Sequence, residues 1–526
     1  MKLTTLIRTW FTLIVLMMLN GMVSCRKKDH SPGNDLVITS FTPDVAWYGY
    51  GHTVTIYGNK FSEVLSENTI TVGTVKAEIL TATTTQLKVQ IEQGMQSGYI
   101  HVTTNGKEAV SDHQLIINQL SWQKKLVGSA EAEAYAIYPV ADGGYFVVGN
   151  TKSTGGDLRV PNKGDHDMWF AKLDSAKNIV WQNTLGGSAQ DLAVAAVPAP
   201  DGGFFIAGNA ASQDGDFTGG PGGTGRDIWI IKVNANGGVT WKKVLGGTKE
   251  DWTSDIVGAS DGGCIMAGYT FSKDGDVKGL HGSSDMWIVK LDAGGSLVWQ
   301  KPLGGTRGDA ATCIGWDIDG GLLLGGSTNS TDGDVTSPPK GQTDMWIVKL
   351  DVGGNLVWQK TLGGTGIDAA NSITATPEGG CAVVGTTDSQ DGDITNAHGV
   401  EDIWVVKLNR VHDIAWQKNI GGSGIDVAAS IAGVSDRGLV VAGHTYSNDG
   451  DMIGNHGGWD IWMAKFSVDG KITGQRILGG SDNEQLHGMT PTADNGYLLA
   501  GWAGSVNGDV TDPRAGVNMW LLKVWE

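Results

Sequence analysis

The stretch Trp358-Gln359-Lys360-Thr361-Leu362-Gly363-Gly364 is one copy of a segment that recurs along the chain every 58 to 60 residues. Its copies begin at Trp122, Trp181, Trp241, Trp299, Trp358 and Trp416, with a degenerate copy at Gly474. A second marker with the same period, Trp-x-x-Lys, begins at Trp169, Trp229, Trp287, Trp346, Trp404, Trp462 and Trp520. A fixed period of this kind indicates a repeat architecture.

Each repeat contains four short apolar runs separated by turns. In the fifth repeat these runs span residues 369–376, 381–386, 403–408 and 413–419. Four strands per unit in seven units predict an all-β fold, a seven-bladed β-propeller. A solenoid is the alternative repeat architecture, but its units usually have about 20 to 45 residues.

The phase of the repeat predicts how the ring closes. The last unit ends after its third strand, at residues 519–525, and the missing fourth strand lies in front of the first unit, at residues 120–126. We therefore expect the N-terminal strand of the propeller region to pair with the third strand of the last blade. Closure removes an exposed strand edge, which would otherwise favour aggregation.

The repeat resembles the bacterial seven-bladed β-propeller repeats found in large exported proteins. The likeness lies in Leu-Gly-Gly-(Ser/Thr)-x-x-Asp, then a strand, Asp-Gly-Gly, another strand and Gly-x-Thr, and it extends over residues 120–526. The resemblance implies an exported protein with a binding or surface role. It implies no particular reaction.

Residues 1–24 have the features of an export signal. Basic residues precede an apolar run at residues 10–19, which is too short to span a bilayer. Residues 21–25, Gly-Met-Val-Ser-Cys, resemble a bacterial lipobox, with Met where Leu is usual. The resemblance implies lipidation of Cys25, a tether over residues 25–35 and a lipid anchor, for which we expect the outer membrane. The alternative is an ordinary secretory signal followed by an unmodified cysteine.

Residues 36–118 predict a separate small sandwich of short alternating strands. Three segments resemble the IPT/TIG family of immunoglobulin-like domains: Phe-Thr-Pro at 41–43, Gly-His-Thr-Val-Thr-Ile-Tyr-Gly-Asn-Lys-Phe at 51–61 and Ser-Gly-Tyr-Ile-His-Val-Thr-Thr-Asn-Gly at 97–106. The resemblance implies a spacer or a protein-contact module. We expect it to hold the propeller domain, residues 119–526, away from the membrane.

The charge of the chain limits its partners. It has 56 acidic and 38 basic residues, a formal net charge of -18. A nucleic acid partner is disfavoured, because phosphate binding needs clustered Lys and Arg. Acidic surfaces are compatible with divalent cations.

Many of the carboxylates fall in loops that a propeller places on one face. The loop between the second and third strands carries Ser-x-Asp-Gly-Asp, and another Asp opens the third strand. Hard cations take several carboxylate oxygens from Gly-rich loops, so these residues are candidate calcium ligands. They are Asp274, Asp276, Asp285, Asp332, Asp334, Asp344, Asp391, Asp393, Asp402, Asp449, Asp451 and Asp460.

The structural alternative is that each Asp caps its turn by accepting backbone N–H bonds. It could also pair with a repeated lysine such as Lys290, Lys349 or Lys407. The complete Asp-x-Asp-x-Asp-Gly calcium pattern is absent from the sequence.

Residues that depart from the repeat are better candidates for ligand contacts than residues that follow it. Trp252, Tyr269, Trp459 and Trp502 are such departures, and an aromatic ring can stack on a sugar or anchor a protein contact. Packing at a blade edge is the alternative for each. The sequence has no Gly-x-Ser-x-Gly, His-Glu-x-x-His or phosphate-binding Gly-rich motif, so no catalytic residues are assigned.

These features favour a lipid-anchored binding protein of the cell envelope, with glycan or protein ligands on the acidic propeller face. Two other functions remain open at this point. One is a structural scaffold for an envelope complex, and the other is a polysaccharide-degrading enzyme that uses the same acidic face.

Overall fold

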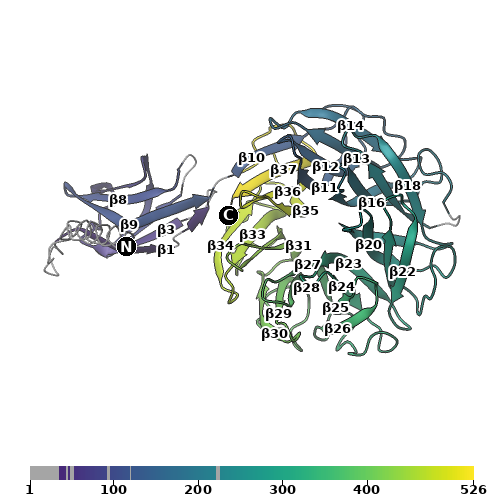
Figure 1. Ribbon diagram of the computed structural model, residues 1–526. Helices are drawn as coiled ribbons and strands as arrows, with labels where there is room; N and C mark the ends of the chain where they lie inside the picture. The colour runs from purple at the N-terminus through teal and green to yellow at the C-terminus, as the bar shows by residue number, and fades with distance from the viewer. Residues whose placement is uncertain are drawn as a thin grey trace, which may run out of the picture.

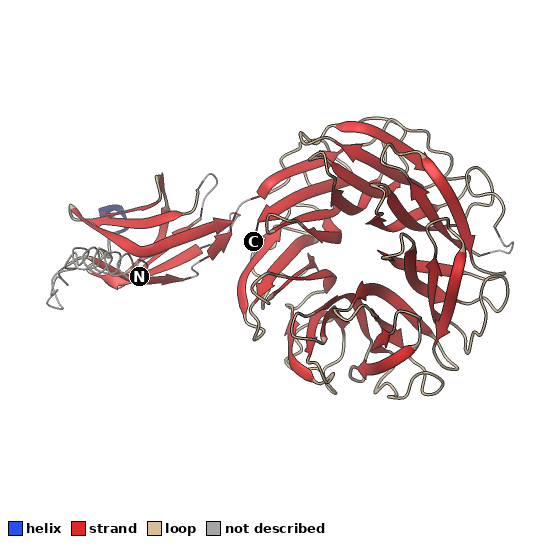
Figure 2. Cartoon of the chain, in the orientation of Figure 1, coloured by secondary structure: helices blue, strands red, loops and turns tan. Residues whose placement is uncertain are grey.

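The computed structural model describes residues 35–42, 45–47, 53–91, 95–118, 120–220 and 225–525. These residues form two all-β parts, a small sandwich and a ring-shaped propeller (Figure 1). A single turn of 3-10 helix, Leu65–Glu67, interrupts the strands of the described sandwich (Figure 2). The predicted export signal, residues 1–24, and Cys25 lie outside the described residues.

The sandwich packs two sheets whose strand orders are β1-β3-β7-β6 and β2-β9-β8-β4-β5. Side chains alternate along its strands: Val54 and Ile56 are buried while their neighbours are partly exposed, as expected for a sheet with one face in a core. The strands are β1 (Val37–Thr42), β2 (Val45–Trp47), β3 (Thr53–Asn59), β4 (Asn68–Val72), β5 (Val75–Lys76), β6 (Glu78–Ala82), β7 (Gln86–Gln90), β8 (Gly98–Thr104) and β9 (Lys107–Asn118).

Within residues 120–220 and 225–525 the chain forms seven four-stranded antiparallel sheets, the blades of the propeller. The innermost strands of blades 1 to 7 are β11 (Ala132–Pro139), β15 (Asp191–Pro198), β19 (Asp251–Gly258), β23 (Asp309–Trp316), β27 (Asp368–Ala375), β31 (Asp426–Gly433) and β35 (Glu484–Pro491). The second strands are β12 (Tyr145–Thr151), β16 (Phe204–Ala210), β20 (Cys264–Thr270), β24 (Leu322–Thr328), β28 (Cys381–Thr387), β32 (Leu439–Thr445) and β36 (Gly496–Ala503).

The two remaining strands of each blade lie farther from the axis. The third strands are β13 (Asp167–Leu173), β17 (Asp227–Val233), β21 (Asp285–Leu291), β25 (Asp344–Leu350), β29 (Asp402–Leu408), β33 (Asp460–Phe466) and β37 (Asn518–Trp525). The outer strands are β14 (Ile179–Leu185), β18 (Val239–Leu245), β22 (Leu297–Leu303), β26 (Leu356–Leu362), β30 (Ile414–Ile420), β34 (Ile472–Leu478) and, for blade 7, β10 (Leu120–Leu126).

The two repeat markers contact each other inside six of the seven blades, and in blade 2 Lys242 stands where the others have the marker glutamine. The third-strand tryptophan is buried, and its indole N–H donates to the glutamine of the outer-strand marker, at 2.7 Å for Trp346 and Gln359. A buried indole N–H needs an acceptor, and the glutamine provides it. The outer-strand tryptophan instead contacts the next blade, as Trp241 does by donating to the carbonyl of Ala293 at 3.0 Å.

The predicted closure is confirmed. Strand β10 pairs antiparallel with β37, from Leu120 opposite Val524 to Leu126 opposite Met519. Gln123 takes the same role as the marker glutamine of the other blades, because its Oε1 accepts the Trp520 indole N–H at 3.1 Å. Residue 119 alone separates β9 from β10, so the strand that ends the sandwich leads directly into the strand that closes the ring.

Two N-terminal deletions should differ in stability. Removing residues 1–127 deletes β10, which leaves the edge of β37 unpaired and exposes apolar surface around Trp520 at about 25 cal/mol per Å². Removing residues 1–118 deletes only the sandwich and the preceding segment. We expect the shorter deletion to be soluble with a cooperative thermal transition, and the longer one to aggregate or melt at a much lower temperature.

The two deletions serve as controls for each other, because both lack the sandwich. Thermal denaturation followed by circular dichroism, with light scattering to detect aggregation, measures the difference. Equal melting temperatures for the two proteins would show that the β10–β37 pair does not hold the ring closed.

Candidate functional site

The Ser-x-Asp-Gly-Asp loops hold the connection that enters their own blade. In blade 4 the backbone N–H of Thr306 donates to Asp332 Oδ1 at 2.7 Å, and that of Gly304 donates to Asp334 Oδ2 at 3.2 Å. Asp274, Asp391 and Asp449 make the same bond as Asp332. Asp393 makes the same bond as Asp334. These carboxylates therefore cap turns.

The Asp residues that open the third strands are buried and cap the preceding loop. The backbone N–H four residues earlier donates to the carboxylate, at 2.8 Å for His281 and Asp285. The same bond is made by Asp344, Asp402 and Asp460. Burial raises the pKa of Asp344 and of Asp460.

Among the candidate calcium ligands, Asp276 and Asp451 contact side chains instead. Asp276 lies 4.0 Å from Lys243 Nζ, and Asp451 lies 3.7 Å from His398 Nε2. Over the part of the chain that the structure describes, no group of three or more His, Cys, Asp or Glu side chains is arranged to hold a metal ion.

The suggested pairing of these Asp residues with the repeated lysines is wrong. Lys290 contacts Asp261, and Lys407 contacts Glu378, which both lie in turns between the first and second strands, on the opposite face of the ring. Each blade has one such pair, and the others are Lys172–Asp142, Lys232–Asp201, Lys349–Asp319, Lys465–Asp436 and Lys523–Asp494.

The four aromatic candidates lie on three blades. Trp252 and Tyr269 are directly opposite each other on β19 and β20, with near-parallel rings 6.2 Å apart. The Arg226 guanidinium lies 5.0 Å from the Trp252 ring. Trp459 packs against a histidine and a tyrosine of blade 6, and Trp502 lies on β36 of blade 7. All four are partly buried.

His444 of β32 occupies the position at which blades 1 and 2 have asparagines that bond to the next blade. Asn150 donates to the carbonyl of Ala193 at 3.1 Å, and Asn209 donates to that of Thr253 at 2.9 Å. The His444 ring contacts the Trp459 ring edge-on at 5.0 Å. Burial, followed by the nearby His487, lowers the pKa of His444 to about 4.

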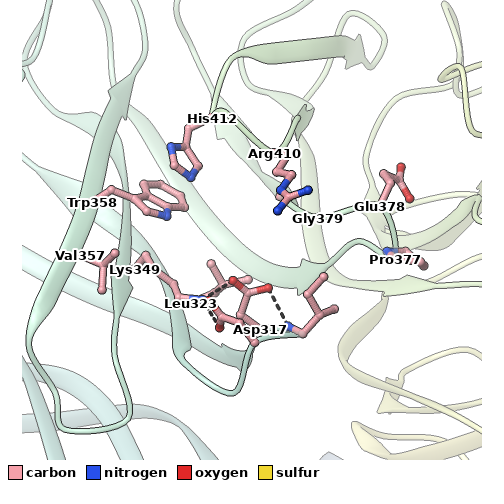
Figure 3. Close-up of a pocket in the computed structure, with 13 residues that line it drawn as sticks. Asp317, Leu323, Lys349, Val357, Trp358, Pro377, Glu378, Gly379, Arg410 and His412 are labelled. Atoms are coloured by element: carbon pink, nitrogen blue, oxygen red, sulfur yellow. Dashed lines mark hydrogen bonds and ion pairs between the residues drawn. The ribbon is translucent and has the colours of Figure 1, made fainter.

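A cavity of about 540 Å³ lies between blades 4 and 5, on the face opposite the acidic loops (Figure 3). Turns and strand ends of both blades line it, because the first-to-second and third-to-fourth turns meet on this face. Trp358 and His412 lie on one side, Pro377 and Glu378 on the other, with Arg410 between them (Figure 3).

The floor of this pocket is an ion-pair cluster, in which blade 4 adds a second carboxylate, Asp317, to the repeated lysine–carboxylate pair. Lys349 Nζ contacts Asp317 and lies 2.6 Å from Asp319 Oδ1. Asp319 is the repeated partner of this lysine, whereas Asp317 stands where the other blades have Val140, Ala199, Ala259, Thr376, Val434 and Thr492. The backbone N–H of Ile318 also donates to Asp317, at 2.6 Å.

One wall of the pocket is an aromatic pair. The rings of Trp358 and His412 stack with centroids 4.1 Å apart. His412 has φ +67°, and the equivalent position in most other blades is a glycine that packs against the tryptophan of the preceding blade: Gly237, Gly295, Gly354 and Gly470. Burial, then the charge of Lys360, lowers the pKa of His412, so the ring is neutral at pH 7.

The rim of the pocket carries Arg410 and Glu378. A methyl group added at Gly379 would lie 3.3 Å from Arg410 Cγ, so the arginine stem passes close over the turn of β27 and β28. Glu378 contacts Lys407, which holds its pKa below the usual value although burial opposes this. The other blades have Asp at the position of Glu378, and those with the equivalent turn have Ala, Val or Ser at the position of Arg410.

Comparison with known protein families finds a match in the N-terminal part of the chain. Residues 36–116 match the IPT/TIG domain family. In the described residues this IPT/TIG domain is followed by the four-stranded blades. The regulatory protein FlaEY of Caulobacter vibrioides is 26% identical over 191 residues, which are 34% of this chain and 20% of that protein. The chain therefore matches about a fifth of that relative's length.

Solved structures with a similar fold include two from Bacteroides thetaiotaomicron. One is an auxiliary nutrient binding protein, 11% identical, with a TM-score of 0.42 over 95% of this chain and 100% of that one. The other is a putative phosphatase, 11% identical, with a TM-score of 0.40 over 94% of this chain and 98% of that one. No helix among the described residues, IPT/TIG domain included, is long and apolar enough to cross a membrane.

The aromatic candidates predicted from the sequence do not line this pocket. Asp317, Glu378, Arg410 and His412 each depart from the repeat, and an alignment of the seven copies shows this. These departures point to a site only when each is assigned to its turn. On this face the turns of one blade meet those of the next blade at the boundary between them.

A second cavity, of about 240 Å³, follows the propeller axis and is lined by residues of all seven innermost strands. Several of its polar side chains tie neighbouring blades together. Thr312 donates to the carbonyl of Ala370, and Asn371 donates to that of Ala428, both at 2.6 Å. These two polar side chains of the channel therefore have a structural role, because they join neighbouring blades.

Chelation should leave the melting temperature of the propeller unchanged. A ligand that binds only the folded state stabilises it by mass action, so a calcium-loaded protein would melt lower in EDTA. Here the Asp carboxylates already accept backbone N–H bonds. Differential scanning calorimetry with EDTA, then with excess calcium, and elemental analysis of the purified protein test this. A melting point that falls in EDTA and recovers with calcium would establish bound ions.

His444 should make the fold less stable in acid. Its pKa is about 4 in the folded protein and about 6.5 in an unfolded chain, so protonation favours unfolding. This contribution is fully present above pH 6.5 and is lost as the pH falls towards 4, by at most about 3 kcal/mol. Urea denaturation of His444→Asn at pH 7 and pH 4 should show a correspondingly smaller loss than the wild type.

His101→Asn is the control for this pH dependence, because His101 is a partly exposed residue of the sandwich that pairs with Glu108. It should leave the loss between pH 7 and pH 4 close to that of the wild type. If His444→Asn loses as much stability as the wild type, the buried imidazole is not the titrating group.

Proposed function

We propose that this chain is a lipid-anchored binding protein of the cell envelope whose propeller binds a glycan in the pocket between blades 4 and 5. The observation that carries the proposal is the gathering of blade-specific residues around one cavity. Asp317, Glu378, Arg410 and His412 come from three different turns and meet beside Trp358. A residue repeated in every blade is explained by the fold, as the lysine partner Glu378 is, whereas Asp317, Arg410 and His412 are not.

The chemistry of the pocket suits a saccharide. Aromatic rings supply a flat apolar surface for a sugar ring, and carboxylates and a guanidinium bond to hydroxyl groups around its edge. Trp358 and His412 provide the first feature, and the ion-paired carboxylates with Arg410 provide the second. The cavity volume of about 540 Å³ lies in the range of small-molecule sites, about 300 to 1,000 Å³.

The location of the ligand site differs from the expectation drawn from sequence. The acidic face contains most of the repeated carboxylates, but they cap turns, and the pocket lies on the other face. A scaffold for an envelope complex would not need this cavity. A polysaccharide-degrading enzyme would need a pair of carboxylates free to exchange protons, and the lining carboxylates contact lysines.

The pocket should be tested with matched glycine substitutions. His412→Gly restores the residue that most blades have at this position, so it removes the ring without straining a backbone that has φ +67°. Lys177→Gly makes the same change in blade 1, where φ is also +67°, away from the pocket. We expect His412→Gly to weaken binding to glycans found on an array by about tenfold, and Lys177→Gly to leave it unchanged, by calorimetry.

Equal affinities for the two variants would place the glycan elsewhere on the molecule. An array on which no glycan binds would contradict the proposed function. Loss of intact glycan from the incubated samples would instead point to an enzyme.

The lipid anchor is tested at Cys25, which lies outside the described residues. Cys25→Ala removes the thiol that would be acylated, and multiple acyl chains are what make such an anchor stable. We expect the variant to appear in the soluble fraction after cell fractionation, while the wild type stays with membranes through a high-salt wash. A variant that remains with membranes after that wash would refute the lipoprotein hypothesis.

A further inference from the structure

The charged side chains that line the pocket differ in whether they form ion pairs. Asp317 and Asp319 both contact Lys349, whose side chain is only 4% exposed, and Glu378 contacts Lys407. Each lining carboxylate thus already faces an ammonium group. A carboxylate held in this way is a poor partner for a second cation. Asp317 and Asp319 share one ammonium group, so their cluster keeps one negative charge.

Arg410 is the exception among the lining residues. It is exposed at the rim, and among the described residues no carboxylate forms an ion pair with its guanidinium. Its stem lies close over Gly379. The five N–H groups of a guanidinium form a planar fork that matches a carboxylate or a sulfate in two parallel bonds.

The sequence context makes this arginine unusual. The chain has a formal net charge of -18, and the equivalent positions in blades 2, 3, 4 and 6 are Ala235, Ala293, Val352 and Val468. The repeat therefore does not require a charge here, and a turn with alanine is compatible with the fold. Arg410 lines the same cavity as the stacked Trp358 and His412 rings.

We infer that the pocket selects an anionic saccharide, a sugar unit whose carboxylate or sulfate group binds Arg410 while its ring lies against Trp358 and His412. This rests on the proposed glycan-binding function and adds the charge of the ligand. The neutral imidazole of His412 contributes ring contact, and the Lys349 cluster beneath it bonds to hydroxyl groups. Because the protein carries a net charge of -18, its long-range field does not attract an anionic sugar, and the attraction has to come from Arg410 at short range.

The test uses pairs of probes that differ only in charge. Galacturonate oligosaccharides and their neutral methyl esters share the same sugar rings, and a sulfated oligosaccharide with its desulfated form provides a second pair. Calorimetry on the full chain should show the acid binding about tenfold more tightly than the ester, with the preference reduced at high salt. The pair that shows the preference identifies whether carboxylate or sulfate is the group bound.

Arg410→Ala should abolish this preference by weakening the acid about tenfold and leaving the ester unchanged, because a charge-assisted bond is lost. Arg410→Lys should retain part of it, since it keeps the charge and loses the fork. His412→Gly should weaken acid and ester alike. Lys177→Gly is the control for both residues.

Two failures are distinguishable. If acids and esters bind equally and His412→Gly weakens both, the pocket binds glycans but the inferred selection of anionic sugars is wrong. If no saccharide of either kind binds, the proposed function is wrong and the inference with it. A preference for acids that survives Arg410→Ala overturns the role of this arginine.

Discussion

The pairing of β10 with β37 is the contact on which the rest of the propeller depends. Blades pack face to face around an axis, so a ring in which one blade lacks its outer strand leaves both a bare edge and an uncovered tryptophan. The chain solves this with its first propeller strand, and Gln123 completes for Trp520 the same bond that the other marker glutamines make. Because β9 leads into β10 across one residue, the sandwich is joined to the ring at its point of closure.

The acidity of the protein follows largely from the way its turns are built. Turns rich in glycine leave backbone N–H groups that strands do not use, and each needs an acceptor. The Asp residues of the repeat supply these acceptors, as Asp332 does for Thr306 and Asp344 does for Lys340. Repeated local hydrogen bonding in the turns therefore contributes to the net charge of -18.

The fold could be predicted because its determinants are periodic. The markers at Trp346 and Trp358 repeat in step, so strand number, blade number and the closing strand all follow from counting. The pocket could not be predicted in this way. Asp317 and Arg410 are far apart in the sequence and belong to different blades, and only the packing of one blade against the next brings them to the same cavity. Choosing aromatic departures from the repeat led to residues such as Trp252 and Tyr269, which lie opposite each other on two neighbouring strands.

A repeat protein acquires a site by departing from its own pattern, and His412 shows the physical cost of such a departure. A residue with a side chain in the left-handed region is disfavoured by about 1 to 2 kcal/mol, and most blades avoid this with glycine. At His412 the ring stacks on Trp358 and forms a pocket wall. Lys177 is at the same backbone position, and its ammonium lies 5.2 Å from the Trp122 ring. Both departures offset the strain by contact with the tryptophan of the preceding blade, so the repeated tryptophan limits which side chains this turn can present. At His412 that limit yields an aromatic wall, and Arg410 stands two residues earlier in the same turn.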